Sequence, residues 1–221
     1  MTEAILLPAA GHTQSLQLRG PVGRIEAVLT GPAGPVRGGV VICHPHPLYG
    51  GAMSNKVAYT LASTAAKQGY YALRFNFRGV GKTEGLHDQG GGETDDTVWL
   101  CEWLRAAMAA DAAVLLAGFS FGAFVSLKAA ARAHPAALMS VAPPFGKYFG
   151  GEALPPHPGC PWTVLHSHDD EVVNFDDTAQ ELARYTPPPQ QVAVDGCGHF
   201  FHGRLSEVND AFAALLNQLP S

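Results

Sequence analysis

Short apolar runs alternate with longer amphipathic stretches along most of this chain. Runs of four to six mostly apolar residues predict buried strands, because a strand covered on both faces is apolar at successive positions. These runs are Gly39–Cys43, Tyr70–Phe75, Ala113–Ala117, Leu138–Val141, Trp162–His166 and Gln191–Val194. Between most of them, the pattern predicts helices over Asn55–Lys67, Thr94–Met108, Phe121–Ala133, Asp176–Arg184 and Leu205–Leu219.

The order of these elements indicates a fold class. Strands that alternate with helices form a parallel sheet through right-handed crossovers, and the helices cover both faces. Ahead of them, Leu16–Leu18 and Arg24–Leu29 flank the turn segment Gly20–Gly23, which predicts an antiparallel hairpin. We therefore expect an α/β fold with a mostly parallel central sheet and an antiparallel N-terminal hairpin, forming a single domain over residues 1–221. Ligands of such folds bind at the carboxyl ends of the strands.

The connection Ala142–Pro161 is long and carries no predicted strand or helix. It contains Pro143–Pro144 and Pro155–Pro156, which disfavour a continuous helix because proline lacks an amide hydrogen and restricts the residue before it. We therefore expect no cap domain at this position.

Composition and charge narrow the classes of function. Hydrophobic residues make up 47% of the 221 residues, charged residues make up 15%, and the formal net charge is −5. This charge gives no electrostatic reason to expect nucleic acid or an anionic membrane as a partner. No segment reaches the roughly 18 apolar residues of a membrane span, and the N-terminal residues do not resemble a signal peptide. A small-molecule substrate fits better, and the oligomeric state is left open.

The four cysteines favour a reducing compartment. Cys43, Cys101, Cys160 and Cys197 are far apart and form no C-x-x-C pair. Such spacing is unlike a disulfide framework of a secreted domain. We therefore expect a cytoplasmic protein.

A serine motif lies where chemistry is expected. Gly118-Phe119-Ser120-Phe121-Gly122 falls between a predicted strand and a predicted helix. In that context G-x-S-x-G forms a nucleophile elbow, a tight turn that presents the serine at the carboxyl edge of the sheet. Glycines on both sides allow the turn to tighten, because they have no Cβ. Ser120 is therefore the candidate nucleophile.

A serine nucleophile needs a base within hydrogen-bond reach and a carboxylate that orients the base. In folds with this elbow, the acid and then the histidine follow the serine along the chain. His199 lies in a glycine-rich loop after the last predicted strand and is the candidate base, with His202 as a competitor. Asp169, Asp170 and Glu171 follow the preceding strand and compete for the role of the acid.

Several segments occur in an order shared with a known superfamily. They are Cys43-His44-Pro45-His46-Pro47, Gly50-Gly51, Asn55-Lys56, Arg74–Gly81, the elbow at Gly118–Gly122, Asp170–Val173 and His199–Gly203. In this order they resemble a small, lidless group of bacterial α/β-hydrolases, near the dienelactone-hydrolase-like and predicted-esterase families. The resemblance implies a carboxylesterase-type serine hydrolase with a Ser-His-Asp triad and an acyl-enzyme, acting on a small ester without metal or other cofactor.

The resemblance favours one of the competing acids and limits the substrate. The acid of this superfamily typically begins an Asp-x-x-Val pattern, which Asp170 and Val173 match, whereas Asp169 matches it only loosely. Dienelactone hydrolases themselves carry a cysteine in the elbow, where this chain has Ser120. Dienelactone is therefore not the expected substrate.

The resemblance also implies an oxyanion hole built from two backbone N–H groups. One belongs to the residue after the nucleophile, Phe121. The other comes from the loop after the third strand, whose prolines have no N–H to donate. His46 is the first eligible donor there, with Leu48 and Tyr49 as alternatives.

The substrate itself is not indicated by the sequence. Esters, thioesters, lactones and some amides share this machinery. The residues expected to contact the substrate are large side chains near the motifs, namely Tyr49, Met53, Phe119, Phe121, Phe145 and Tyr148.

Two other functions compete with a serine hydrolase. The first is metal-dependent hydrolysis, because histidines and carboxylates at neighbouring strand ends can converge on a metal. The residues concerned are His44, His46, His166, His168, Asp169 and Asp170. The second is a catalytically silent binding protein, although such proteins usually lack a triad member and all three roles have candidates here. Gly81-Lys82-Thr83 resembles the end of a P-loop, but Asn76 replaces the required glycine, so nucleotide binding is not expected.

Overall fold

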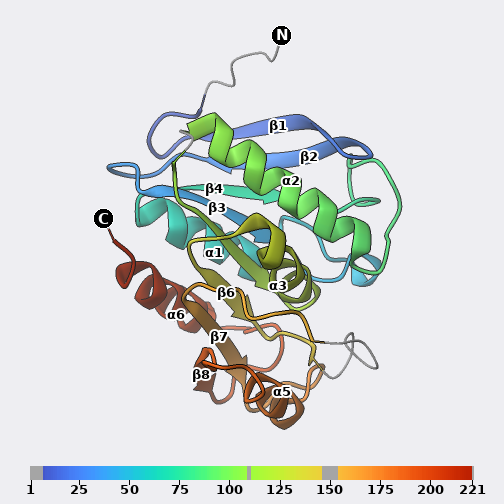
Figure 1. Cartoon of the computed structure of the whole chain (residues 1–221), viewed down its shortest axis with the longest axis vertical. Helices are drawn as coiled ribbons and strands as arrows, with labels where there is room; N and C mark the ends of the chain where they lie inside the picture. Colours follow the sequence, from blue (N-terminus) through green and yellow to red (C-terminus); the bar gives the residue numbers. More distant parts are fainter. Residues whose placement is uncertain (1–6, 109–110, 146–153, 221) are drawn as a thin grey trace.

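One sheet of eight strands forms the centre of the computed structural model, which describes residues 7–108, 111–145 and 154–220 (Figure 1). The strands are β1 (Thr13–Gly20), β2 (Gly23–Thr30), β3 (Gly38–Cys43), β4 (Tyr70–Phe75), β5 (Val114–Phe119), β6 (Leu138–Val141), β7 (Trp162–Ser167) and β8 (Gln190–Val194). Their order across the sheet is β1-β2-β4-β3-β5-β6-β7-β8. β2 pairs antiparallel with both β1 and β4, and every other pairing is parallel. The predicted α/β fold is therefore confirmed.

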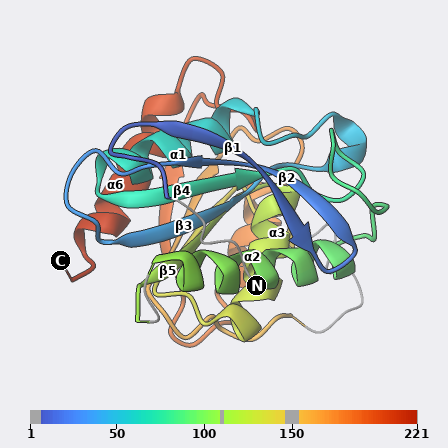
Figure 2. The same ribbon diagram turned by 90° about the horizontal axis from the view of Figure 1, so that it is seen from above.

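Helices cover both faces of this sheet. They are α1 (Lys56–Lys67), α2 (Gly91–Met108), α3 (Phe121–Ala133), α5 (Phe175–Leu182) and α6 (Leu205–Asn217), and a short 3₁₀ helix, η1 (Pro47–Tyr49), was not predicted. Figure 2 shows α2 on the opposite side of the sheet from α1 and α6. The buried apolar residues form two clusters, one including α2 and α3 and the other including α1 and α6. No helix in the described part of the chain is long and apolar enough to cross a lipid bilayer.

The last strand differs from its prediction. β3, β5 and β7 are buried at every position, but no residue of β8 is buried, although the run Gln191–Val194 was expected to be a buried strand. The reason is its position at the edge of the sheet, where it pairs only with β7. An edge strand exposes more of its surface than a central one.

The parallel strands bring distant loops to one edge of the sheet. β3, β5 and β7 run in the same direction, so the segments after Cys43, Phe119 and Ser167 leave the sheet at its carboxyl edge. The connection after β6 leads away from this edge, and residues 154–161 form neither helix nor strand. The remaining part of that connection, 146–153, lies outside the described residues.

A buried ion pair fastens the loop after β4 to α2. Arg78 donates two hydrogen bonds to the carboxylate of Asp96, each 2.8 Å long, and both residues are buried. Gly92 makes room for the guanidinium, because a Cβ there would lie 1.8 Å from Arg78 Nη1. Arg78 of the loop is thus held in place by Asp96 of the helix.

Asp96→Asn should lower the free energy of unfolding by about 3 kcal/mol, because it leaves a buried guanidinium without its counter-charge. Urea unfolding followed by circular dichroism measures this loss. Asp95→Asn is the matched control on the same helix, since Asp95 forms an exposed ion pair with Arg132 and should lose less than about 1 kcal/mol. Equal losses in the two variants would show that the Arg78 pair does not fasten α2.

Candidate active site

Ser120 lies at a strained turn between β5 and α3. Its backbone has φ 53° and ψ −121°, a conformation that residues other than glycine rarely adopt. Hydrogen bonds hold it there: Ser120 N–H donates to Val141 O (2.9 Å), and Ser120 O accepts from the N–H groups of Ala123 (2.8 Å) and Phe124 (3.2 Å). The predicted elbow is therefore present, with the hydroxyl at the carboxyl edge of the sheet.

The two glycines of the elbow are required by close backbone packing. A Cβ at Gly118 would lie 2.2 Å from Gly122 O, inside the turn itself. A Cβ at Gly122 would lie 2.2 Å from Cys43 O, at the end of the neighbouring strand β3. The start of α3 is thereby pressed against the loop that leaves β3.

His199 and Asp170 complete a chain of hydrogen bonds that begins at Ser120. His199 Nε2 is 3.0 Å from Ser120 Oγ, and His199 Nδ1 is 2.8 Å from Asp170 Oδ2. All three residues are brought together as predicted, although 79 positions separate Ser120 from His199. The His199 side chain is buried, and its ring packs over Phe119 with 5.0 Å between the ring centres.

The Asp170 carboxylate is fully buried and remains ionised. Its Oδ1 accepts N–H groups from Val172 (2.9 Å) and Val173 (2.7 Å), and its Oδ2 accepts from the rings of His166 and His199. Burial by itself would raise the pKa of Asp170, but the hydrogen bonds from the two histidines and from Val173 outweigh it and hold the pKa well below its usual range. A charged partner for His199 is therefore present at neutral pH.

The two competing carboxylates also contact the histidine loop, but through its backbone. Asp169 Oδ2 accepts the N–H of Gly196 at 2.5 Å, and Glu171 Oε2 accepts the N–H of His199 at 3.0 Å. Only Asp170 faces the imidazole. The competing histidine, His202, is exposed and packs near the Phe200 ring, with 5.8 Å between the ring centres.

The loop after β3 places His46 beside Phe121, with 4.7 Å between their ring centres. Of the alternative oxyanion donors, Leu48 N–H is bound to His46 Nδ1 (3.2 Å) and Tyr49 N–H to His46 O (3.2 Å). Both of these amides are used within η1. The two positions first predicted for the oxyanion hole are therefore neighbours in the fold.

A cavity of about 350 Å³ opens at Ser120 and His199. Its other lining residues are Pro45, His46, Tyr49, Gly50, Gly51, Asn55, Pro144, Val172, Val173 and Phe200. Of the predicted substrate contacts that the structure describes, only Tyr49 is among them. The sequence offered a partial signal for the rest, since Gly50, Gly51, Asn55 and the two valines belong to the segments that carry the family resemblance.

Four other predicted substrate contacts do not line this cavity: Met53, Phe119, Phe121 and Phe145. Phe121 is fully buried. Phe119 lies beneath the His199 ring, and Phe145 is buried near Tyr185. Met53 is anchored through its backbone, with its N–H donating to Asn76 and its carbonyl accepting from Arg74. Large apolar side chains next to a catalytic motif are used for packing here. Tyr148 lies outside the described residues.

The histidines proposed as metal ligands do not converge. His44 is buried, with Nδ1 2.6 Å from Pro45 O and Nε2 accepting the N–H of Phe77 (3.0 Å), and burial lowers its pKa to about 4. His168 forms a partly exposed pair with Asp195. Across the described ranges, no group of three or more His, Cys, Asp or Glu side chains is placed to hold a metal ion.

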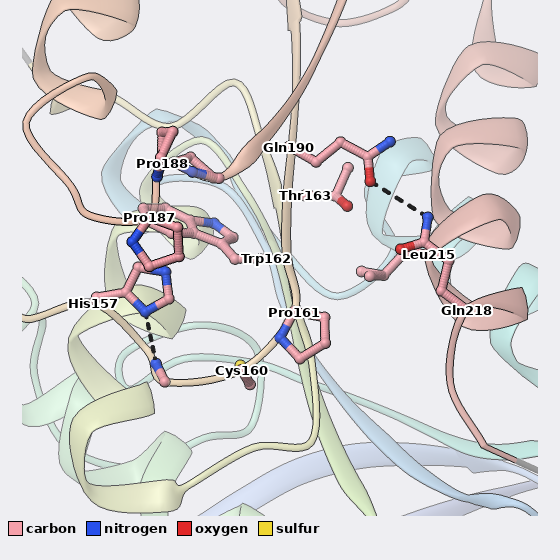
Figure 3. Close-up of a pocket in the computed structure, with 12 residues that line it drawn as sticks. His157, Cys160, Pro161, Trp162, Thr163, Pro187, Pro188, Gln190, Leu215 and Gln218 are labelled. Carbon is pink, nitrogen blue, oxygen red and sulfur yellow. Dashed lines mark hydrogen bonds between the residues drawn. The ribbon is translucent and has the colours of Figure 1, made fainter.

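A larger cavity, of about 540 Å³, lies at the opposite edge of the sheet. Figure 3 shows its lining at the start of β7 and near α6, including Pro161, Trp162, Pro187, Gln190 and Gln218. Ser120, His199 and Asp170 do not line this larger cavity. Its size therefore does not make it the candidate active site.

The fold and the comparisons with known proteins together place this chain among the α/β-hydrolases. The chain is 35% identical to an α/β serine hydrolase without a lid from Xanthomonas campestris, whose crystal structure superposes with a TM-score of 0.89 and 98% and 99% of the two chains covered. An α/β serine hydrolase homologue from Coxiella burnetii is 39% identical, with a TM-score of 0.86 and 93% and 97% covered. An uncharacterised protein of Rickettsia prowazekii is 34% identical over 89% of this chain and 85% of its own length. The chain belongs to the family described as X-Pro dipeptidyl-peptidase (S15 family), which it matches over residues 24–192.

Gly122→Ala should reduce the labelling rate of Ser120 by a fluorophosphonate about 100-fold, because a Cβ overlapping Cys43 O forces the elbow away from β3 and misplaces the hydroxyl. The rate is measured by mass spectrometry of the labelled protein. Gly34→Ala serves as the control, since a Cβ there meets nothing within 4 Å. A Gly122→Ala protein that labels at the unchanged rate would contradict the close packing of the elbow.

Proposed function

We propose that this hydrolase cleaves carboxylic esters of small molecules through an acyl-enzyme on Ser120. The observation that carries the proposal is the continuous chain from Ser120 Oγ through His199 to the buried carboxylate of Asp170, at the mouth of a cavity. Serine by itself is a weak nucleophile, and this arrangement supplies the base and the counter-charge that it needs.

The chemistry follows from these positions. His199 Nε2 takes the proton of Ser120 Oγ as the oxygen attacks the ester carbonyl carbon. The resulting imidazolium returns this proton to the leaving alcohol as the C–O bond breaks. A water molecule, deprotonated in turn by His199, then attacks the acyl-enzyme, and the released Ser120 oxygen regains a proton. Asp170 stays ionised throughout and stabilises the imidazolium.

The tetrahedral intermediate carries a negative oxygen that needs hydrogen-bond donors. We assign this role to the backbone N–H groups of Phe121 and His46. Two observations support the assignment: Phe121 directly follows Ser120 at the start of α3, and His46 lies beside it while the amides of Leu48 and Tyr49 are used within η1.

The cavity lining favours an ester over the substrate class in the family description. A dipeptidyl-peptidase binds a free amino terminus, and a buried ammonium group requires a carboxylate or comparable acceptors. Among the described residues that line the Ser120 cavity, none is aspartate or glutamate. The lining is instead largely apolar, and its polar side chains are those of Tyr49, Asn55, Ser120 and the two histidines.

The size and openness of the site favour short acyl groups. Tyr49 and Phe200 at the cavity rim are 79% and 44% exposed, so no other described segment covers them. An acyl chain that extends past the rim would keep its apolar surface in water and gain little of the roughly 0.8 kcal/mol per buried CH₂.

Ser120→Ala and His199→Ala should each reduce kcat/KM for p-nitrophenyl butyrate by about 10⁵-fold or more, because the members of a triad act as a unit. Asp170→Asn should reduce it by about 10⁴-fold, since the imidazolium loses its counter-charge and its tautomer is no longer set. The rates are measured spectrophotometrically, after circular dichroism shows that each variant is folded.

Asp169→Asn and His202→Ala are the matched controls for this series, because neither side chain faces Ser120 or the His199 ring. Each should retain activity within about tenfold of the parent. Near-parental turnover of Ser120→Ala would end the proposal, and a greater loss in Asp169→Asn than in Asp170→Asn would assign the acid to Asp169.

Among p-nitrophenyl esters of increasing length, kcat/KM should be highest for acyl groups of about two to six carbons, because a longer chain is not buried. X-Pro p-nitroanilides should be turned over at least about 100-fold more slowly than the best ester, since the described lining offers no carboxylate to their amino terminus. A steady rise of kcat/KM to twelve carbons would show that the chain is covered. Faster cleavage of the X-Pro substrates would replace the ester by a peptide as the substrate class.

A further inference from the structure

A second histidine contacts the carboxylate of Asp170. His166, at the end of β7, is 3% exposed, and its Nε2 lies 3.1 Å from Asp170 Oδ2 and 3.2 Å from Val173 O. The same oxygen, Oδ2, accepts from His199 Nδ1 at 2.8 Å. One carboxylate oxygen is therefore shared between two imidazoles, of which only His199 reaches Ser120.

The protonation state of the His166 ring follows from its partners. Both partners of Nε2 are acceptors, so Nε2 carries the hydrogen and donates it. Nδ1 is buried and has no hydrogen-bond partner among the described residues, so a hydrogen there would be a buried donor without an acceptor. His166 thus acts toward Asp170 as a neutral N–H donor.

Few charged groups surround this pair. A cavity of about 50 Å³ beside the His166 ring is lined by residues of β7, α5 and β8, and none of the described ones except His166 is ionisable. On the far side of Phe175, His168 pairs with Asp195. On the side of His199, Glu171 accepts the backbone N–H of that residue. Within the described ranges, Asp170 is therefore the only ionised side chain in contact with the His166 ring nitrogens.

We propose that His166 is a positioning residue that shares Oδ2 of Asp170 with His199 and so sets the pH range over which His199 acts as the base. The inference rests on the proposed triad. A hydrogen bond to the ionised form of a carboxylate stabilises that form. Because the His166 N–H also donates a hydrogen bond to Oδ2, it weakens the attraction between Asp170 and the His199 imidazolium. His199 therefore releases its proton at a lower pH than it would without this donor.

A role in packing alone makes a different prediction. Loss of packing would lower kcat or stability without moving the pH dependence. Loss of the N–H donor would strengthen the Asp170–His199 interaction and extend the protonated state of His199 to higher pH. Since protonated His199 cannot accept the Ser120 proton, the acidic limb of kcat/KM would then move to higher pH.

Three variants separate these roles. His166→Phe keeps a ring but removes the donor, and the neighbouring cavity offers space for the larger side chain. His166→Leu removes the donor with a smaller, aliphatic side chain. His166→Gln retains an N–H group that reaches toward Asp170. His168→Gln is the matched control, because His168 is partly exposed and contacts Asp195 instead.

Profiles of kcat/KM for p-nitrophenyl butyrate are measured from pH 4 to 9 for each variant. We expect the midpoint of the acidic limb to rise by about 0.5 to 1 pH unit in His166→Phe and His166→Leu. In His166→Gln and His168→Gln it should stay within about 0.2 pH unit of the parent, with KM within about twofold throughout. An unmoved midpoint in both donor-free variants, or an equal shift in His166→Gln, would overturn the proposal.

A second measurement separates this inference from the proposed function. The ring signals of His199 are titrated by NMR in the Ser120→Ala background, where no turnover is needed. The titration midpoint should rise by about the same 0.5 to 1 pH unit when His166→Phe or His166→Leu is added. A fully active Ser120→Ala protein would refute the triad. If Ser120→Ala is inactive but the His199 titration midpoint does not change when His166→Phe or His166→Leu is added, only the role of His166 is refuted.

Discussion

The buried negative charge of Asp170 is the constraint on which the site depends. An ionised carboxylate without contact to water is costly unless hydrogen bonds satisfy it. Here two backbone amides bind one oxygen, and two imidazoles bind the other. The amides require a tight turn directly after β7, and the imidazoles come from the end of that strand and from the loop after β8. One charge therefore determines the shape of two loops and the direction of the His199 ring.

The same loop is held by the other acidic residues of the turn. Asp169 and Glu171 accept N–H groups of Gly196 and His199, so three successive carboxylates contact a single segment. Two of them set the path of the backbone and one orients the side chain. This division explains how three acidic residues can lie beside His199 while only Asp170 contacts its ring.

Ser120 is held by a different kind of interaction. The elbow is stabilised by the close approach of backbones, with Gly122 against the carbonyl of Cys43 and with Ser120 in a strained conformation. Strain of this kind persists only when the surrounding structure over-determines it. Here the strands β3, β5 and β6 surround the turn and hold it, so the position of the Ser120 hydroxyl depends on several strands of the sheet. The family description names a peptidase. The proposal of ester cleavage rests on the cavity beside the hydroxyl, whose described lining includes no carboxylate.

The amino-acid sequence was sufficient to predict the fold class and to select Ser120, Asp170 and His199 as candidates. Apolar periodicity marks buried strands and amphipathic helices, and the order of motifs along a parallel sheet determines which loops share an edge. The exposure of β8 was predicted wrongly, because burial of a strand depends on its neighbours in the sheet as well as on its own apolar residues.

Only the tertiary structure decided which side chains face the cavity and which face the core. Phe119, Met53 and Phe145 lie near the motifs in sequence, yet they pack or anchor the scaffold, whereas Val172, Val173 and Phe200 line the cavity. It alone also showed that His166 donates to Asp170. The physical reason is that a hydrogen bond depends on the direction of a side chain to within a few tenths of an ångström. That direction is set by packing between segments far apart along the chain, and a linear pattern does not contain it.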